Sequence, residues 1–342
     1  MLARVGLRQP RIDVPIHSFT IHPFTIKKNM PIPIVLFAFK RPHELRQTLT
    51  ALRANHLAAQ SDLYVFVDGP RPSRPDEPAK VAAVQSMIDE LTGFRQIYRQ
   101  YQPVNKGCAN SIIAGVTAVL EKHPAVIVLE DDIVTSPNFL DYMNQCLTQY
   151  ANTPGVFSVG GYTFPFPRPA GYTDDVYFFG RTCAWGWGIW ADRWQRVDWS
   201  LADFDAFAAD PAARRAFNAN GQDRFRMLQR TKAEEIDAWD IRLCYAEFKE
   251  AALTVYPTLS KTINIGVDSP DSTTEVVYNR YKTILDGGTQ RQFALPQILA
   301  VQPDYARRFR RKFSVSVRAW NKLKTYLMAV KLARRGSITP NS

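Results

Sequence analysis

The stretch AVIVLEDDI, from Ala125 to Ile133, places three acids directly after a short apolar run. Such a run, rich in β-branched residues, is typical of a strand buried on both faces of a parallel sheet. Ligands of open parallel sheets bind beyond the carboxyl ends of the strands, so Glu130, Asp131 and Asp132 are expected at the functional edge. Adjacent carboxylates repel one another, and Mg²⁺ or Mn²⁺ is a suitable counter-charge. The alternative is a solvated acidic turn that caps the next helix.

Strand and helix patterns alternate on both sides of this stretch. Strand-like runs occupy residues 31–39, 63–67, 98–101, 156–159, 176–179 and 253–256. Helical patterns begin at Arg41 and cover 80–91, 110–120 and 137–150, and residues 201–250 are mainly helical. This alternation predicts an α/β fold with right-handed crossovers, a mostly parallel sheet and flanking helices. We expect one domain over residues 31–300 and a basic tail over residues 305–336.

The composition is that of an ordinary globular protein. Of the 342 residues, 46% are hydrophobic and 22% are charged, which excludes collagen-like and wholly disordered chains. Lys and Arg total 43 against 32 Asp and Glu, but no acid follows Asp304 and eleven of the bases lie between Arg307 and Arg335. The rest of the chain is formally neutral, so a surface that coats nucleic acid is not indicated and no nucleic-acid partner is expected.

The cysteines and the N-terminal segment suggest a reducing compartment. Cys108, Cys146, Cys183 and Cys244 match no metal or redox spacing and are interpreted as reduced core residues. Residues 1–29 lack the apolar stretch of a signal peptide, and no apolar run has membrane-spanning length. We therefore expect a cytoplasmic protein, whose first 29 residues are disordered or precede the true translation start.

Several motifs together resemble a known family. They are FKRP at 39–42, VDG at 67–69, VIVLEDDIVTSPNFLDYM at 126–143, FFGRTCAWGWGIW at 178–190, DAWDIR at 237–242 and the segment 257–266. With them the chain resembles the GT-A glycosyltransferases that use nucleotide sugars. The likeness is greater to the group around the eukaryotic N-acetylglucosaminyltransferase that starts N-glycan branching and its bacterial sugar-transferase relatives. It implies a Rossmann-like GT-A fold, a UDP-sugar donor, Mn²⁺ or Mg²⁺, and inverting transfer to a hydroxyl of a glycan or glycolipid.

The same resemblance implies roles at the early strand ends. Arg41 and Asp68 match positions that contact the nucleotide base and neighbouring groups, with a helix-capping ion pair and an Asp-Gly turn as the alternatives. Glu130 and Asp131 match the ribose side of the donor site. Asp132 matches the carboxylate that ligates the metal.

Two acids are candidates for the catalytic base that accepts the proton of the acceptor hydroxyl. Asp237 and Asp240 flank Trp239 in a segment where the family carries a catalytic Asp. We favour Asp237 as the base and Asp240 as a structural partner of Arg242, with the opposite assignment left open.

Other residues are candidates for donor contacts. Asn105 and Lys106 lie in a loop before a helix, where an N-terminus can bind phosphate, although an ordinary turn fits equally well. Trp185, Gly186 and Trp187 form a candidate wall for the donor sugar, and burial in the core is the alternative for each tryptophan. One departure from the family pattern is that no His follows His123, whereas the bacterial relatives commonly place one after the Asn-Ile-Gly segment.

The tail combines bases with an apolar stripe at helical spacing. The stripe contains Phe313, Val317, Trp320, Leu323, Leu327 and Val330. This pattern is typical of an interfacial helix on anionic lipid, which would place the protein on the inner face of the cell membrane. A domain-closing helix or a solvated basic end is the alternative. For the whole chain, the alternatives to a glycosyltransferase are a sugar nucleotidyltransferase and a non-catalytic membrane- or nucleic-acid-binding adaptor.

Overall fold

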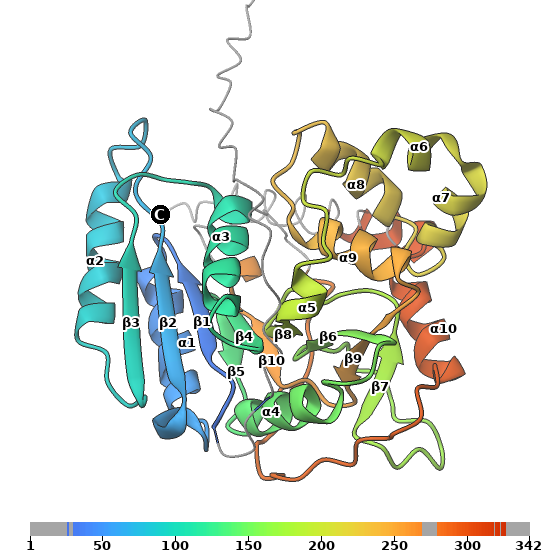
Figure 1. The fold of residues 1–342 in the computed structure, drawn as a ribbon, viewed down its shortest axis with the longest axis horizontal. Helices are drawn as coiled ribbons and strands as arrows, with labels where there is room; N and C mark the ends of the chain where they lie inside the picture. The colour runs from blue at the N-terminus through green and yellow to red at the C-terminus, as the bar shows by residue number, and fades with distance from the viewer. Residues whose placement is uncertain (1–25, 27–29, 269–278, 318, 322, 326–342) are drawn as a thin grey trace, which may run out of the picture.

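The structure is a computed structural model that describes residues 26, 30–268, 279–317, 319–321 and 323–325. Its centre is an 8-stranded sheet in the order β3-β2-β1-β4-β8-β6-β9-β7 (Figure 1). The strands of this sheet are β1 (Ile34–Ala38), β2 (Asp62–Val67), β3 (Gln96–Tyr101), β4 (Ala125–Glu130), β6 (Val156–Gly160), β7 (Val176–Phe179), β8 (Trp187–Trp190) and β9 (Leu253–Pro257). A separate antiparallel pair joins β5 (Ile133–Thr135) and β10 (Thr262–Asn264).

Parallel pairing dominates the N-terminal half of the sheet. β1 pairs in parallel with both β2 and β4, and β2 pairs in parallel with β3. β8 then runs antiparallel to both β4 and β6. The predicted α/β class is confirmed, and the strand-like runs of the sequence all become strands. The short strands β5, β8 and β10 were not predicted, and the residues of β8 lie among tryptophans and glycines that carry no alternating pattern.

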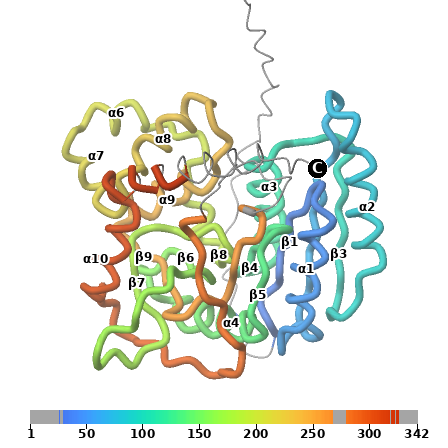
Figure 2. Tube along the Cα trace, turned by 180° about the vertical axis from the view of Figure 1, so that it is seen from behind, coloured from blue at the N-terminus to red at the C-terminus, as the bar shows by residue number. Residues whose placement is uncertain are grey.

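Helices cover both faces of the sheet, as the front and back views show (Figures 1 and 2). They are α1 (Pro42–Arg53), α2 (Glu77–Asp89), α3 (Cys108–Leu120), α4 (Phe139–Gln149), α5 (Ala191–Trp194), α6 (Phe204–Ala209), α7 (Pro211–Asn218), α8 (Arg224–Lys232), α9 (Asp240–Lys249) and α10 (Pro303–Lys312). Alternate residues of β1 face opposite sides. Leu36 packs in a cluster with α1, α2 and α4, whereas Val35 packs in another with α3 and α9.

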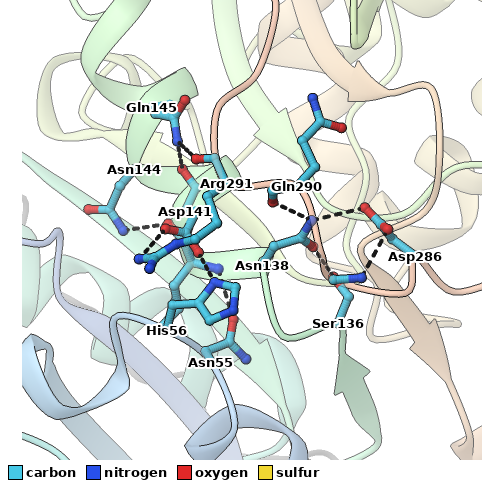
Figure 3. A network of polar contacts seen from close by, with 12 residues as sticks. Asn55, His56, Ser136, Asn138, Asp141, Asn144, Gln145, Asp286, Gln290 and Arg291 are labelled. Atoms are coloured by element: carbon cyan, nitrogen blue, oxygen red, sulfur yellow. Dashed lines mark hydrogen bonds and ion pairs between the residues drawn. The ribbon is translucent and has the colours of Figure 1, made fainter.

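A polar network holds the segment 286–291 against the start of α4 (Figure 3). The Asn138 side chain donates to Asp286 Oδ2 at 3.1 Å and to the Gln290 carbonyl at 2.8 Å. Asp141 accepts from Arg291 at 3.3 Å and contacts His56 Nδ1 at 2.7 Å. Because Asp286 also pairs with Lys261, just before β10, the network fixes the strand pair that lies beside the candidate site.

The beginning of the tail closes the aromatic part of the core. Tyr305, Phe309 and Phe313 are at most 5% exposed and pack with Tyr177 and Phe179. The prediction that Phe313 lies on a lipid-facing stripe is therefore wrong, because its ring packs against Phe309 at 5.6 Å between ring centres. α10 is therefore a helix that closes the domain, which was the alternative to a lipid-bound helix. Leu327 and Val330 lie outside the described residues, as do nearly all of residues 1–29.

The structure bears on the expected burial of the cysteines and on the expectation that no segment spans a membrane. The four cysteines are free thiols, but only Cys146 and Cys244 are buried, and Cys108 is exposed. Within the described ranges, the chain contains no helix with the length and apolar character needed to cross a bilayer.

Candidate functional site

The candidate site lies where β1, β2 and β4 end at the same edge of the sheet. Parallel strands bring their carboxyl ends together, and the register pairs Phe37 with Glu130. The Asp68 N–H donates to the Ala38 carbonyl at 3.0 Å, which places the end of β2 beside the end of β1. The polar residues after β1 and β4 meet at this edge, and Asp68 follows β2 beside them.

Arg41 joins the two acids that follow Glu130. It donates through Nη1 to Asp132 Oδ2 at 2.8 Å and through Nη2 to Asp131 Oδ1. The other Asp131 oxygen accepts from the Phe39 N–H at 3.1 Å. Asp131 and Asp132 are 2% and 7% exposed, so this is a buried network and not a solvated turn.

Asp132 Oδ1 is the atom of this network that lacks a partner. It is buried and accepts no hydrogen bond from the described residues. A buried carboxylate oxygen without a donor is costly, so this oxygen is the atom of the network that is available to a further partner.

The electrostatics of the network reflect burial and crowding of like charges. Burial, together with the charges of Asp132 and Asp131, raises the pKa of Glu130 to about 8. Burial also raises the pKa of Asp131, to about 6, although Arg41 opposes the shift. Burial disfavours the charged form of Arg41, but both aspartates outweigh that effect and the pKa of its guanidinium is raised. The acids thus exceed the positive charge available to them, and a further cation would relieve the repulsion.

A close backbone approach completes the network. The Ile265 N–H donates to the Asp132 carbonyl at 2.9 Å. A Cβ atom placed on Gly266 would lie 2.0 Å from Asp132 Oδ2 and 2.7 Å from Arg41 Nη1, so a side chain cannot fit there. The sequence analysis gave Gly266 no role, although it closes the Asn-Ile-Gly segment of the resemblance.

Asp68 supports the loop that contains Asn105 and Lys106. Its Oδ1 accepts from the N–H groups of Gly69 and Lys106, both at 2.9 Å. Its Oδ2 accepts from the Asn105 side chain at 2.9 Å and from the Gly107 N–H at 3.2 Å. Four donors occupy the acceptor positions of a carboxylate. Asp68 and Asn105 therefore shape the loop, and their contact with a nucleotide stays a prediction.

Asp237 reaches the N-terminus of α3 from a distant part of the chain. Its Oδ2 accepts from the Ala109 N–H at 3.2 Å and would lie 3.3 Å from a Cβ on Gly107. Gly107 has a φ of +84°, which glycine adopts readily. The carboxylate thus faces the positive end of α3, and its exposed side chain is open to an acceptor.

The thiol of Cys108 shows how close the acids of the two segments are. Desolvation first, and then the charges of Glu130, Asp237 and Asp240, raise the pKa of Cys108. Acids from the end of β4 and from residues 237–240 therefore contribute to the raised pKa of the same thiol. Neither the residue type of Cys108 nor the spacing of the cysteines in the sequence indicated that Cys108 lies near these acids.

Asp240 is the first residue of α9 and is half-buried. Desolvation raises its pKa, and Arg181 opposes the shift. The expected ion pair with Arg242 is not among those of the described residues. The positive charge of Arg242 is instead favoured by Asp237, although burial lowers its pKa overall.

The candidate sugar wall divides into two kinds of residue. Trp187 is 1% exposed and stacks on Trp239 with ring centres 5.0 Å apart, so it is a core residue and does not line an open site. Trp185 is half-buried, and a Cβ on Gly186 would lie 3.3 Å from a Leu129 methyl group, one residue before Glu130. Trp185 and Gly186 remain candidates for the donor sugar.

The residues present fit a metal that is held jointly with a substrate. In the part of the chain that the structure describes, no group of three or more His, Cys, Asp or Glu side chains could hold a metal. Mg²⁺ and Mn²⁺ are often bound by one or two carboxylates plus substrate phosphates, and the unpartnered Asp132 Oδ1 supplies one such oxygen.

Comparison with known proteins gives partial structural likenesses. No protein family model and no curated protein sequence matches the chain. The mannosyltransferase PcManGT from Pyrobaculum calidifontis, in complex with GDP-Man and Mn2+, is similar over 47% of this chain and 45% of its own, with 11% identity and a TM-score of 0.30. S. aureus TarS is similar over 68% and 36%, with 9% identity and a TM-score of 0.41. Mouse xyloside xylosyltransferase 1 in its apo form is similar over 67% and 84%, with 10% identity and a TM-score of 0.34.

The chain thus spans less than half of the length of PcManGT and of TarS. At these identities and TM-scores the likenesses assign neither a family nor an activity to this chain.

Proposed function

We propose that this chain is a glycosyltransferase that moves a sugar from a nucleoside-diphosphate sugar, most simply a UDP-sugar, to a hydroxyl of a glycan or glycolipid. The observation that carries the proposal is the buried Arg41–Asp131–Asp132 network at the carboxyl edge, with one carboxylate oxygen unpartnered. Two further acids lie at and just before the start of α9, and one of them, Asp237, accepts from the Ala109 N–H at the N-terminus of α3. The arrangement suits a reaction that binds a diphosphate on one side and takes up a proton on the other.

The donor half of the site is proposed as follows. Asp132 would hold a divalent cation together with the diphosphate, and Arg41 keeps the carboxylates of Asp131 and Asp132 in place. When bound, the cation offsets the negative charge of the leaving diphosphate. Glu130 and Asp131 would face the ribose, and the loop held by Asp68 would present Asn105 and Lys106 to the nucleotide. Trp185 and Gly186 would border the sugar.

The acceptor half is proposed to use Asp237. The acceptor oxygen attacks the anomeric carbon while the bond from that carbon to the diphosphate breaks, which inverts the configuration. The hydroxyl proton passes to the Asp237 carboxylate, and the electron pair of the broken bond leaves with the diphosphate. The Ala109 N–H at the N-terminus of α3 orients the Asp237 carboxylate.

Calorimetry with UDP, with and without Mn²⁺, tests the donor half. We expect UDP to bind only when Mn²⁺ is present and Asp132→Asn to weaken binding by about tenfold or more, because a charge-assisted contact is lost. Asp205→Asn, an exposed acid on α6, is the matched control and should bind as the wild type does. Equal affinity of wild type and Asp132→Asn would contradict the metal assignment. Tight binding of nucleoside triphosphates alone would favour a nucleotidyltransferase.

A further inference from the structure

A groove with an unusual charge lies between α10 and the segment that follows β6. Its volume is about 380 Å³. The lining residues that matter here are Phe164, Phe166, Arg280, Arg308, Arg311 and Lys312. Four cations therefore meet in one groove, and none of the described residues that line it is an acid.

The four cations of the groove are not neutralised by the described part of the chain. None of Arg280, Arg308, Arg311 and Lys312 forms an ion pair there, whereas the neighbouring Arg307 pairs with Asp304. Lys312 lies 4.9 Å from the centre of the Phe164 ring. Desolvation and the charge of Arg280 lower the pKa of Lys312. The cations of Lys312 and Arg280 therefore repel each other across the groove. An anion between them would relieve this repulsion.

The other wall of the groove is apolar. Phe164 is 3% exposed and is fixed by Phe309 and Phe313, whose ring centres lie 5.6 and 5.9 Å from its own. Phe166 lies beside it, with ring centres 5.5 Å apart. A ligand that combines an anionic group with an apolar or ring-shaped substituent matches both walls.

A chain of aromatic rings connects the groove to the candidate sugar site. The ring centres of Phe164 and Tyr281 lie 6.0 Å apart, and those of Tyr281 and Trp185 lie 5.1 Å apart. Tyr162 supports this contact, because its hydroxyl donates to the Tyr281 carbonyl at 2.8 Å and its ring meets Trp185. These packed rings fix the groove and the candidate sugar site relative to each other, with Tyr281 between Phe164 and Trp185.

We infer that the groove binds a phosphate or diphosphate group of the acceptor, with Arg308 and Arg311 as its main contacts and Phe164 and Phe166 beside the attached substituent. The inference rests on the proposed function, because it places the acceptor relative to the sugar site. The phosphoryl group can belong to a soluble phosphorylated glycan or to a lipid-linked one. Arginine recognises the phosphoryl group of both sources in the same way, because two parallel N–H donors of its guanidinium point at phosphate oxygens.

The test measures binding of two phosphoryl probes in metal-free buffer that contains EDTA and no nucleotide. The probes are inorganic pyrophosphate and decyl phosphate below its micelle concentration. We expect the double variant Arg308→Gln/Arg311→Gln to weaken binding by about tenfold or more, because two charge-assisted contacts are removed. Arg307→Gln is the matched control, since Arg307 is exposed on the same helix and already paired, and its affinity should stay within about twofold of the wild type. Both arginines of the double variant are exposed, so the thermal unfolding of that variant should match the wild type.

The two probes distinguish the source of the phosphoryl group. Tighter binding of decyl phosphate than of pyrophosphate indicates a lipid-linked acceptor, because the chain lies along Phe164 and Phe166. Similar binding of both probes indicates a soluble phosphorylated acceptor.

The inference is overturned if neither probe binds, or if the double variant and Arg307→Gln lose the same affinity. Failure of the proposed function is a separate result, because it is read from UDP and Mn²⁺ at Asp132. A chain that binds UDP with Mn²⁺ but neither probe retains the donor site and lacks the phosphoryl site.

Discussion

Asp237 and Asp240 differ in what surrounds them, although they are three residues apart. Asp237 is exposed and accepts a hydrogen bond from the N-terminus of α3. Asp240 is half-buried, and desolvation raises its pKa. An exposed carboxylate that a hydrogen bond orients is the better proton acceptor for a hydroxyl that enters from solvent.

We therefore predict that Asp237→Asn lowers turnover by roughly 10²- to 10⁴-fold and leaves donor affinity near normal. Asparagine keeps an oxygen that can accept from the Ala109 N–H, so the local fold should be retained. Steady-state kinetics and UDP calorimetry on the same preparations check both parts. Asp240→Asn is the comparison, and the roles are reversed if only that variant loses turnover.

Glu77 connects two of the loops that border the site. It is fully buried, and its carboxylate accepts from the Arg71 N–H at 3.0 Å and from Lys40 at 3.0 Å, in addition to the Arg71 guanidinium. The hydrogen bonds from Arg71 are the main reason that the pKa of Glu77 falls from its ordinary 4.5 to about 2. Because the folded-state pKa is depressed, the resulting stability is present above pH 4.5 and is lost as the pH falls toward 2.

Glu77→Gln should lower the free energy of unfolding at pH 7 by about 1–3 kcal/mol, the range for hydrogen bonds to charged groups that lose a buried partner. The difference from the wild type should shrink as the pH is lowered below 4.5. Urea unfolding at pH 7 and near pH 3 measures it. Glu90→Gln, at the exposed end of α2, should show no such difference, and a gap for Glu77→Gln that is independent of pH would refute the assignment.

Among the elements, α10 has the clearest structural role. The charge pattern of its sequence resembles that of a surface helix, but Phe309 is 3% exposed and stacks on Phe179 with ring centres 4.2 Å apart. The bases Arg307, Arg308, Arg310 and Arg311 remain exposed on the outer side. One helix thus closes the core and presents cations to the groove.

Phe309→Ala should destabilise the protein by about 3–5 kcal/mol, because it leaves a cavity among packed aromatic rings. Trp320→Ala should change stability by no more than about 0.5 kcal/mol, since Trp320 is 56% exposed. Chemical denaturation of both variants checks this contrast. A stable Phe309→Ala protein would show that α10 is not needed for the fold.

At the scale of the whole molecule, the net charge of +11 is a property of the C-terminal segment. Exposed apolar residues accompany these bases, among them Val315, Trp320 and Leu323. The combination supports the proposal that this end contacts an anionic membrane surface, now limited to residues after the packed Phe313.

We predict that the protein sediments with vesicles that contain phosphatidylglycerol and not with pure phosphatidylcholine vesicles. Binding should weaken as salt rises from about 0.1 M to about 1 M, where the screening length falls from about 10 Å to about 3 Å. Trp320→Ser should reduce binding, whereas Ile298→Ser, at a more exposed apolar position outside the tail, should not. If the wild type does not sediment with phosphatidylglycerol vesicles, an anionic membrane is not a partner of this protein.

The sequence by itself determined the class of the fold and the position of its acids. Short apolar runs rich in β-formers predicted β1, β2 and β4, and apolar residues at a period near 3.6 predicted the helices that follow them. The placement of Asp131 and Asp132 after a buried strand followed from the same reasoning, because a parallel sheet brings strand ends together. The excess of bases after Asp304 also required only counting.

Only the tertiary structure decided which distant residues meet. Asp237 contacts the start of α3 across 128 positions of sequence, and Gly266 lies against Asp132 for lack of a side chain. Tertiary packing also placed Trp187 in the core and left Trp185 at the edge, although the two are neighbours in one motif. The reason is that burial of an irregularly spaced aromatic residue depends on the surfaces that surround it, and those surfaces come from elements far away in the chain.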